Sequence, residues 1–264
     1  MSYFSELQIE QSEKIINKMQ KALSTVNKKA ADKIRAFIED NAINVAIPQD
    51  MNRLIEMCYG VSTAYGEAAA SVACEAYDAL GLAADLILEP AVPAEVASYG
   101  EVAKALQGTA KTSQNANELS SSVSRLVKRT GQDTLLKNAR RDGAEVAWIP
   151  SGDTCAFCIM LASRGWEHVS RQTARNGHAE HIHANCDCTY AIRFDSSVNY
   201  KGYDPDKYLE QYREADGGTT EEKLNSMRRR YYAENRETIL AQKASAYEKR
   251  MELNSSAAEE TKVD

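Results

Sequence analysis

Two short clusters of metal-binding side chains in the second half of the chain constrain its fold more than any other feature. The first is Cys155 and Cys158, two thiols separated by two residues, and the second contains His183, Cys186 and Cys188. A structural zinc ion takes four Cys or His ligands in a tetrahedron, so these clusters offer five candidate ligands for four positions. The spacing predicts one structural zinc ion that joins two clusters separated by 24 residues.

The sequence leaves the choice of the four ligands open. If the second cluster is extended, Cys186 and Cys188 point to the same face, and both thiols bind while His183 packs behind them. In the alternative, His183 binds and one of these two cysteines is spare. Reduced thiols in a small core, or a redox Cys-x-x-Cys pair in the first cluster, are rival interpretations. The redox pair is disfavoured because no βαβ pattern surrounds it.

Two enzyme classes use related combinations of histidine and cysteine. Zinc deaminases place His-x-Glu before Pro-Cys-x-x-Cys, whereas here the segment that begins at His178 follows the cysteine pair, and residue 154 is threonine. A zinc-stabilised HNH-like nuclease would need a separate catalytic histidine, and His178 with Asn185 could serve, although nothing in their spacing requires it. Neither a Gly-rich phosphate loop nor a Ser/His/Asp signature is readable. The sequence therefore favours a protein that is not an enzyme.

The first part of the chain has the periodicity of amphipathic helices, because apolar residues recur at intervals of three, four or whole turns. The stripes are Phe4, Leu7, Ile15, Ile16, Met19 and Leu23, then Ile34, Phe37 and Ile38, then Met51, Leu54, Ile55, Cys58, Ser62, Tyr65, Ala69, Val72, Ala73 and Ala76. The position of Cys58 on the third stripe predicts burial between helices rather than a reactive thiol. Residues 1–106 are expected to form a helical region.

Polar and turn-forming residues interrupt this pattern. Residues 107–122 are rich in Ser, Thr, Asn and Gln, which predicts a loop or hinge. A helix over about 118–142 is expected next, and the runs 145–150 and 188–194 contain the β-branched and aromatic residues of strands. The two strands bracket the cysteine clusters, so we expect a small zinc-stapled module over residues 123–200.

The last part of the chain, residues 201–264, carries two helix-start signals. Asp204 precedes Pro205, the order of an N-cap and a first helical position, and Thr219 with Glu222 forms a capping box. The second of these helices is expected to reach about residue 250, before a frayed polar tail. The expected fold class is α+β and predominantly α-helical, with long N-terminal helices, a zinc-stapled module with two short strands, and C-terminal helices.

Charge, hydropathy and cysteine usage exclude several classes of protein. The formal net charge is −6, so the protein as a whole is not a polycation that coats nucleic acid. The most membrane-like stretch, 68–88, contains Glu75, Asp78 and Asp85, which predicts a helix in water and no contact with a membrane. No secretory signal opens the chain. Four of the six cysteines are clustered, which in a reducing compartment favours a metal over disulfides.

The order of these residues resembles that of the MuF-like minor capsid proteins, or phage head morphogenesis proteins, of tailed bacteriophages. The residues that carry the resemblance are Trp148, the pair Cys155 and Cys158, the run Leu161-Ala-Ser-Arg-Gly165 with Trp166, and His183, Cys186 and Cys188, with Tyr208 and Tyr212 downstream. The specific part of the match covers roughly residues 145–195. The resemblance implies a structural, non-enzymatic zinc module.

The same resemblance implies a low-copy component of the virion, located inside the head and present in the host cytoplasm during assembly. Its implied partners are the portal protein and/or the major capsid protein, with residues 1–106 as the associating region. The implied role is in head assembly and in DNA packaging or delivery. The nuclease described above, and a zinc-binding interaction module unrelated to virions, are the alternatives.

Two groups of basic side chains are candidates for contact with DNA. The helix expected over about 118–142 carries Arg125, Lys128, Arg129, Lys137, Arg140 and Arg141. Because Asp133 is the one acid among them, these side chains could contact DNA phosphates, and the alternative is a solvated helix face. The second group, Arg228 to Arg230, has glutamates on both sides, which predicts a solvated face.

Overall fold

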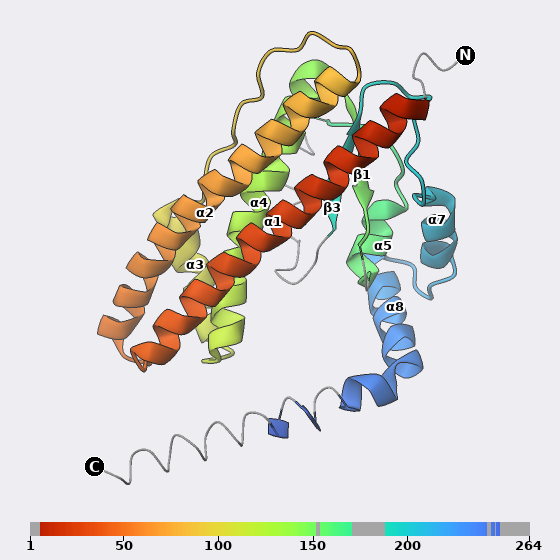
Figure 1. The fold of residues 1–264 in the computed structure, drawn as a ribbon. Helices are drawn as coiled ribbons and strands as arrows, with labels where there is room; N and C mark the ends of the chain where they lie inside the picture. The colour runs from red at the N-terminus through yellow and green to blue at the C-terminus, as the bar shows by residue number, and fades with distance from the viewer. Residues whose placement is uncertain (1–5, 152–153, 171–187, 242–243, 246, 249–264) are drawn as a thin grey trace.

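Three long helices build the body of the molecule and pack along one another (Figure 1). The computed structural model describes residues 6–151, 154–170, 188–241, 244–245 and 247–248. The elements in chain order are α1 (Glu6–Asp40), α2 (Pro48–Ala83), α3 (Tyr99–Ala110), α4 (Ala116–Asp142), β1 (Glu145–Ile149), α5 (Ala156–Ala162), β2 (Glu167–His168), β3 (Thr189–Arg193), α7 (Pro205–Arg213) and α8 (Thr220–Glu234). The body consists of α1, α2 and α4, and the later elements gather along one side of it.

The apolar stripes of the first two long helices are buried, as predicted. Met19 and Ile34 of α1 and Leu54 of α2 each have an exposed fraction of 2% or less. The first two stripes belong to one continuous helix, because α1 runs without a break. One member of the first stripe is an exception, since Leu7 is 71% exposed. The helical character predicted for the first part of the chain is confirmed.

Small residues allow α4 to approach both other helices of the body. A Cβ atom at Gly131 of α4 would lie 3.0 Å from Cδ2 of Leu23 and 3.4 Å from the carbonyl oxygen of Ala69. Leu23 belongs to α1 and Ala69 to α2, so this glycine lies where the three helices meet. The absence of a side chain at Gly131 therefore sets how closely they pack.

The loop or hinge predicted over residues 107–122 is wrong in its length. Both α3 and α4 extend into this range, and residues 111–115 alone separate them. The side chain of Asn115 caps α4, because its Oδ1 accepts a hydrogen bond from the N–H of Asn117 at 2.8 Å. Ser120 and Ser122, two of the serines that suggested a loop, lie on α4 and donate hydrogen bonds to carbonyl oxygens of the preceding turn. The boundary expected at residue 123 falls inside this helix.

An extended segment, residues 86–98, connects α2 to α3 and is here called the strap. Asn138 of α4 accepts a hydrogen bond from the N–H of Val92 (2.9 Å) and donates one to its carbonyl oxygen (3.0 Å). The hydroxyl of Thr134 accepts another from the N–H of Ala94 (3.0 Å). Side chains of α4 thus supply the hydrogen bonds that a neighbouring strand would otherwise supply.

The sheet of the second half has three antiparallel strands in the order β2–β1–β3. The strands predicted at 145–150 and 188–194 are confirmed as β1 and β3, which pair from Glu145 with Arg193 to Ile149 with Thr189. An ion pair closes one end of this pairing, because Nε of Arg193 lies 2.6 Å from Oε2 of Glu145. β2 has two residues, too few to show a periodicity in the sequence.

Both helix starts predicted for the last part of the chain are confirmed. Asp204 caps α7 by accepting hydrogen bonds from two N–H groups of its first turn, and Thr219 opens the capping box of α8. The predicted single helix to about residue 250 is wrong, because α8 ends at Glu234 and residues 236–241 form a separate helical stretch. The frayed tail predicted at the end of the chain lies outside the described residues.

A buried glutamine joins the helical body to the sheet. Gln132 of α4 is 0% exposed, and its Oε1 accepts a hydrogen bond from the N–H of Tyr190 at 3.0 Å. Its Nε2 donates to the hydroxyl of Thr189 at 3.0 Å. Because β3 lies at an edge of the sheet, β1 pairs with it on one side. Gln132 supplies a hydrogen-bond acceptor for its backbone on the other side.

Replacing Gln132 with leucine should lower the free energy of unfolding by about 1–3 kcal/mol, because two buried polar groups of β3 lose their partner. Urea denaturation followed by circular dichroism measures the change. Gln107, which lies exposed on α3, is the matched control, and its replacement with leucine should change the free energy by about 0.5 kcal/mol or less. Equal effects at the two positions would show that Gln132 does not tie α4 to β3.

Candidate metal centre

Three of the five predicted zinc ligands are described, and each stands at the end of an element. Cys155 is the N-cap residue of α5, Cys158 lies in the first turn of the same helix, and Cys188 directly precedes β3. None of the three is joined by a disulfide. The three thiols therefore lie where the chain passes from one element to the next. A metal site that joins separate segments needs ligands in such positions.

The first pair is organised by the start of α5. Cys155 has an extended backbone (φ −70°, ψ 159°), and its Sγ accepts a hydrogen bond from the N–H of Cys158 at 3.5 Å. A serine or aspartate would make the same capping contact through oxygen. Because the two residues are three apart at one helical turn, their side chains leave the backbone on the same side. Cys158 is 2% exposed.

The third thiol is held by the pairing of β1 with β3. Ile149 pairs with Thr189, so the residues just beyond these two also lie close together. The N–H of Ser151 donates a hydrogen bond to Sγ of Cys188 at 3.4 Å, and Cys188 is 1% exposed. This sulfur is therefore buried beside a backbone donor.

The chemistry of these three groups fits zinc. An N–H that donates to sulfur stabilises the thiolate relative to the thiol, and the thiolate is the form that binds Zn²⁺. Two of the three sulfur atoms accept such a bond. Cys155 and Cys188 therefore each have the chemistry of a zinc ligand.

The other two predicted ligands, His183 and Cys186, lie outside the described residues, and so do His178 and Asn185, the candidates for a nuclease. Within the part of the chain that is described, no three His, Cys, Asp or Glu side chains form a group that could hold a metal ion. The four-ligand zinc site therefore remains a prediction. His168, the histidine that is described, lies exposed in β2.

Tyrosines that follow β3 contact the far ends of α5 and β3, and one of them lies near Cys188. The hydroxyl of Tyr203 donates to the carbonyl oxygen of Ala162 at the end of α5 (2.9 Å), and the hydroxyl of Tyr200 donates to the carbonyl of Ile192. Burial and the negative charge of nearby Cys188 raise the pKa of Tyr208. Tyr208 therefore lies near the thiol of Cys188. No motif in the sequence singles out Tyr200 or Tyr203.

The two tryptophans of this module each contact a side chain of β3. Trp148 is 2% exposed and meets Tyr190 edge to face, with ring centroids 4.8 Å apart. The guanidinium of Arg193 lies 4.6 Å from the ring centroid of Trp166, a cation–π contact. Both tryptophans belong to the residues that resemble the phage proteins, and both stabilise the sheet and its connections.

The remaining cysteines lie away from this centre, on α2. Cys58 is 0% exposed within the helical body, and burial raises the pKa of its thiol to about 12. Cys74 is half-buried, and burial raises its pKa as well. These thiols stay protonated at neutral pH, as expected for packing residues rather than metal ligands.

Most of the basic residues predicted to approach DNA from α4 are engaged within the protein. Arg129 forms an ion pair with a carboxylate of α3 at 2.7 Å, and Lys137 and Arg141 donate hydrogen bonds to carbonyl oxygens of the strap. Lys128 is 7% exposed, whereas Arg140 is exposed. These residues fasten the strap and α3 to α4, and DNA contact through them remains a prediction.

The sequence model of the VG15 protein family matches residues 10–215. The chain belongs to this family. Membership suggests a protein encoded by a phage. The match begins in α1 and ends after α7, so it spans the helical body and the module together. No curated protein and no solved structure matches the chain.

The described helices were expected not to enter a membrane. None of them combines the length and the apolar character needed to cross one. The stretch 68–88, the most apolar in the sequence, lies mostly in α2 and contributes Ala69, Ala73 and Leu80 to the protein core.

We expect purified protein to contain about one zinc ion per chain, as measured by inductively coupled plasma mass spectrometry. Cys155→Ser should lose the ion, because a neutral hydroxyl is a poor replacement for a thiolate, and the near-ultraviolet circular dichroism of the module should weaken. Cys74→Ser is the matched control and should retain the zinc. A chain that stays zinc-free and fully folded in chelator would rule out a structural metal.

Proposed function

We propose that the protein is a minor structural component of the head of a tailed bacteriophage, present in few copies inside the head near the portal. There it would aid head assembly and the packaging or delivery of DNA, with the portal protein and/or the major capsid protein as partners. The observation that carries the proposal is the family match over residues 10–215, which includes the residues that resemble MuF-like minor capsid proteins. The proposed protein is structural and has no catalytic role.

The burial of the candidate ligands supports a structural metal rather than a catalytic one. Cys158 and Cys188 are 2% and 1% exposed, Cys155 is half-buried, and Tyr208 lies near Cys188. A catalytic zinc keeps one position open to water or substrate, whereas a structural zinc is enclosed by its ligands. A zinc ion at these thiols would therefore serve to hold α5 against β3.

One end of the helical body supports the proposed contact with the portal or the capsid. Where α1 begins and α2 ends, Leu7, Leu82 and Ile87 are 71%, 75% and 103% exposed. Gln8 donates a hydrogen bond to Asp85 at 2.9 Å, which holds the two helices together there. Large apolar side chains exposed in one region are typical of protein–protein contact surfaces. This end lies within residues 1–106, the region expected to associate with partners.

A nuclease is the second candidate function, and no feature of the described residues favours it. Its proposed residues, His178 and Asn185, lie outside the described part of the chain. Incubation of supercoiled plasmid with the purified protein and Mg²⁺, Mn²⁺ or Zn²⁺ distinguishes the two functions. The structural proposal expects no cleavage, and cleavage that His178→Ala abolishes would replace it.

The protein should be present in purified, DNA-filled virions at a few copies per head. Quantitative mass spectrometry of gradient-purified particles, calibrated against the portal protein, measures the copy number. An abundant host cytoplasmic protein serves as the control for contamination and should be removed by the gradient. Particles that lack the protein would refute its assignment to the virion.

Ile87→Glu should reduce the incorporation of the protein into heads several-fold, because a carboxylate replaces an apolar contact at the proposed surface. The substitution should not alter folding, since the side chain is fully exposed. Ile47→Glu, at the opposite end of α2 and 44% exposed, is the matched control and should be incorporated normally. Equal incorporation of the two variants would place the partner contact elsewhere.

A further inference from the structure

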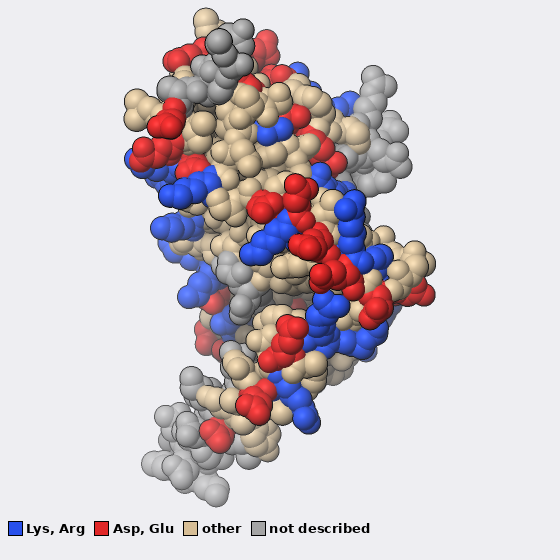
Figure 2. All heavy atoms as spheres, turned by 90° about the vertical axis from the view of Figure 1, so that its right-hand side faces the viewer, with Lys and Arg blue, Asp and Glu red and all other residues tan. Residues whose placement is uncertain are grey.

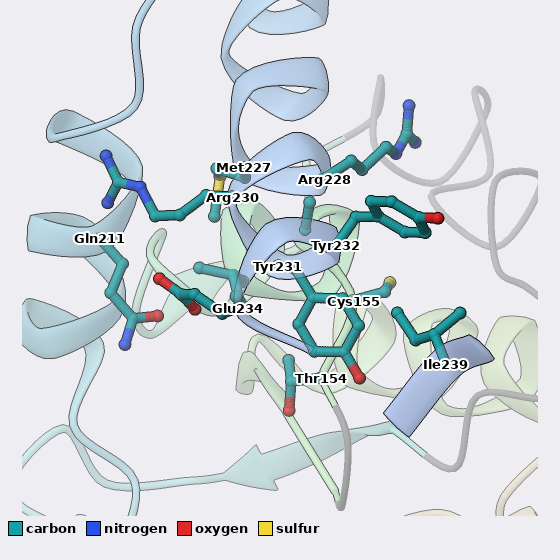
Figure 3. Close-up of a pocket in the computed structure, with 12 residues that line it drawn as sticks. Thr154, Cys155, Gln211, Met227, Arg228, Arg230, Tyr231, Tyr232, Glu234 and Ile239 are labelled. Carbon is teal, nitrogen blue, oxygen red and sulfur yellow. The ribbon is translucent and has the colours of Figure 1, made fainter. Parts of the chain in front are cut away.

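A pocket of about 540 Å³ lies between the start of α5 and the end of α8 (Figure 3). Its apolar lining comes from Ile159 of α5, Met227 of α8 and Ile239. Tyr231 and Tyr232 also line it, and they are 45% and 43% exposed. The volume is in the range of pockets that hold small ligands, and nothing in the proposed structural role uses it.

Charged groups around the pocket are separated by the helix. Figure 3 shows Arg228 and Tyr232 on one side of α8, and Arg230, Glu234 and Gln211 on the other. Arg230 is paired with a carboxylate, that of Glu214, at 3.5 Å. Glu214 and Glu234 therefore lie on the side away from Tyr232, whereas Glu221 lies two turns before Arg228 on the same face as Tyr232.

The side that carries Tyr232 is basic. Arg228 and Arg229 precede this tyrosine by four and three residues, so the three side chains share one face of the helix. Both arginines are exposed, and neither forms an ion pair among the described residues. Arg228 donates a hydrogen bond to the neutral side chain of Asn225 at 2.9 Å, which leaves its charge uncompensated. Charges of both signs are otherwise interspersed on this side of the molecule (Figure 2).

We infer that this pocket binds single-stranded nucleic acid, with an unpaired base against the tyrosine rings and the adjacent phosphates on Arg228 and Arg229. Base–aromatic stacking beside a basic rim is how proteins bind single strands without reading their sequence. Gln211 and Glu234, on the opposite side, offer hydrogen-bonding groups for the edge of a base. In a duplex the bases are paired and stacked, so they cannot enter such a pocket.

The distribution of charge favours a nucleic acid over an acidic polypeptide. Arg228 and Arg229 lie on the side of α8 that carries Tyr232, while most of the lining between α5 and α8 is apolar or aromatic, with Gln211 and Glu234 on the opposite side. A nucleotide matches this arrangement, because its charge is on the phosphate and its planar base is largely apolar on both faces. An acidic peptide carries its charge at the tips of flexible side chains and has no group for the apolar lining. Cys155 also lines the pocket, but the binding inferred here requires no metal.

Fluorescence anisotropy with fluorescein-labelled (dT)20 and the full chain at low salt tests this inference. Wild-type protein should bind the single strand more tightly than a duplex of the same length. Tyr232→Ala should weaken binding about tenfold by removing a stacking surface, whereas Tyr232→Phe should retain it. Arg228→Gln should weaken binding and lower the slope of log affinity against log salt by about 0.7.

The controls are an exposed tyrosine and an arginine remote from the pocket. Tyr99→Ala on α3, where the tyrosine is 46% exposed, and Arg53→Gln on α2 should leave binding unchanged. Circular dichroism and zinc content should match the wild type for each variant.

Absence of binding by the wild-type chain, equal binding by Tyr232→Ala, or competition by polyglutamate as strong as that by unlabelled (dT)20 would overturn the inference. The last result would identify an acidic polypeptide as the ligand.

Discussion

The enclosure of α4 is the constraint on which the rest of the structure depends. This helix packs against α1 and α2, carries the strap, and touches β3. The middle of α4 is largely buried, and a helix buried on all sides is normally apolar all round, yet this part of α4 buries Gln132, Thr134 and Asn138. Each of these side chains bonds to backbone that no strand or helix satisfies. The polar residues of α4 thus determine what can lie against it, and they join two parts of the chain that differ in architecture.

This arrangement changes the part that a metal would play. A small sheet with one short helix cannot bury much core by itself, which suggested a zinc ion as the source of its stability. In the structure, however, Trp148, Tyr190 and Cys188 belong to the same apolar core as the residues of α1, α2 and α4. The sheet therefore draws stability from the helical body. A zinc ion would secure the corner formed by α5 and the start of β3, and its loss should leave the body folded.

The sequence correctly predicted those elements of the fold for which a residue type has one dominant structural role. Helical stripes, the caps at Asp204 and Thr219, and the two strands follow from local periodicity and capping chemistry, and the structure confirms them. The loop predicted over 107–122 was too long, because serine and asparagine are also tolerated in a helix that tertiary packing buries. Local sequence cannot reveal such burial.

The candidate site was predictable in part for the same reason. Two cysteines at a spacing of three residues are typical of a metal clip or of a redox pair, and Cys155 and Cys158 do lie at one helical turn. The choice of ligands depends on how distant segments meet, which the spacing does not encode. Gln132 and Tyr203 were not predictable, because the contacts that make them important join residues far apart in the chain.

The way in which the strap is fastened has a consequence for how members of such a family can diverge. Side chains of α4 hold it through its backbone atoms, including the N–H and carbonyl of Val92 and the carbonyls of Glu89 and Pro90. Some side chains of the strap, Leu88 and Ala97 among them, also pack against the core. Backbone atoms are common to all residues, however, so the exposed side chains of the strap, such as Ile87, are not needed for its attachment. Substitutions there can alter an exposed surface at little cost in stability. A lineage that meets a new partner could adapt by changing this one segment while the helices beneath it stay the same.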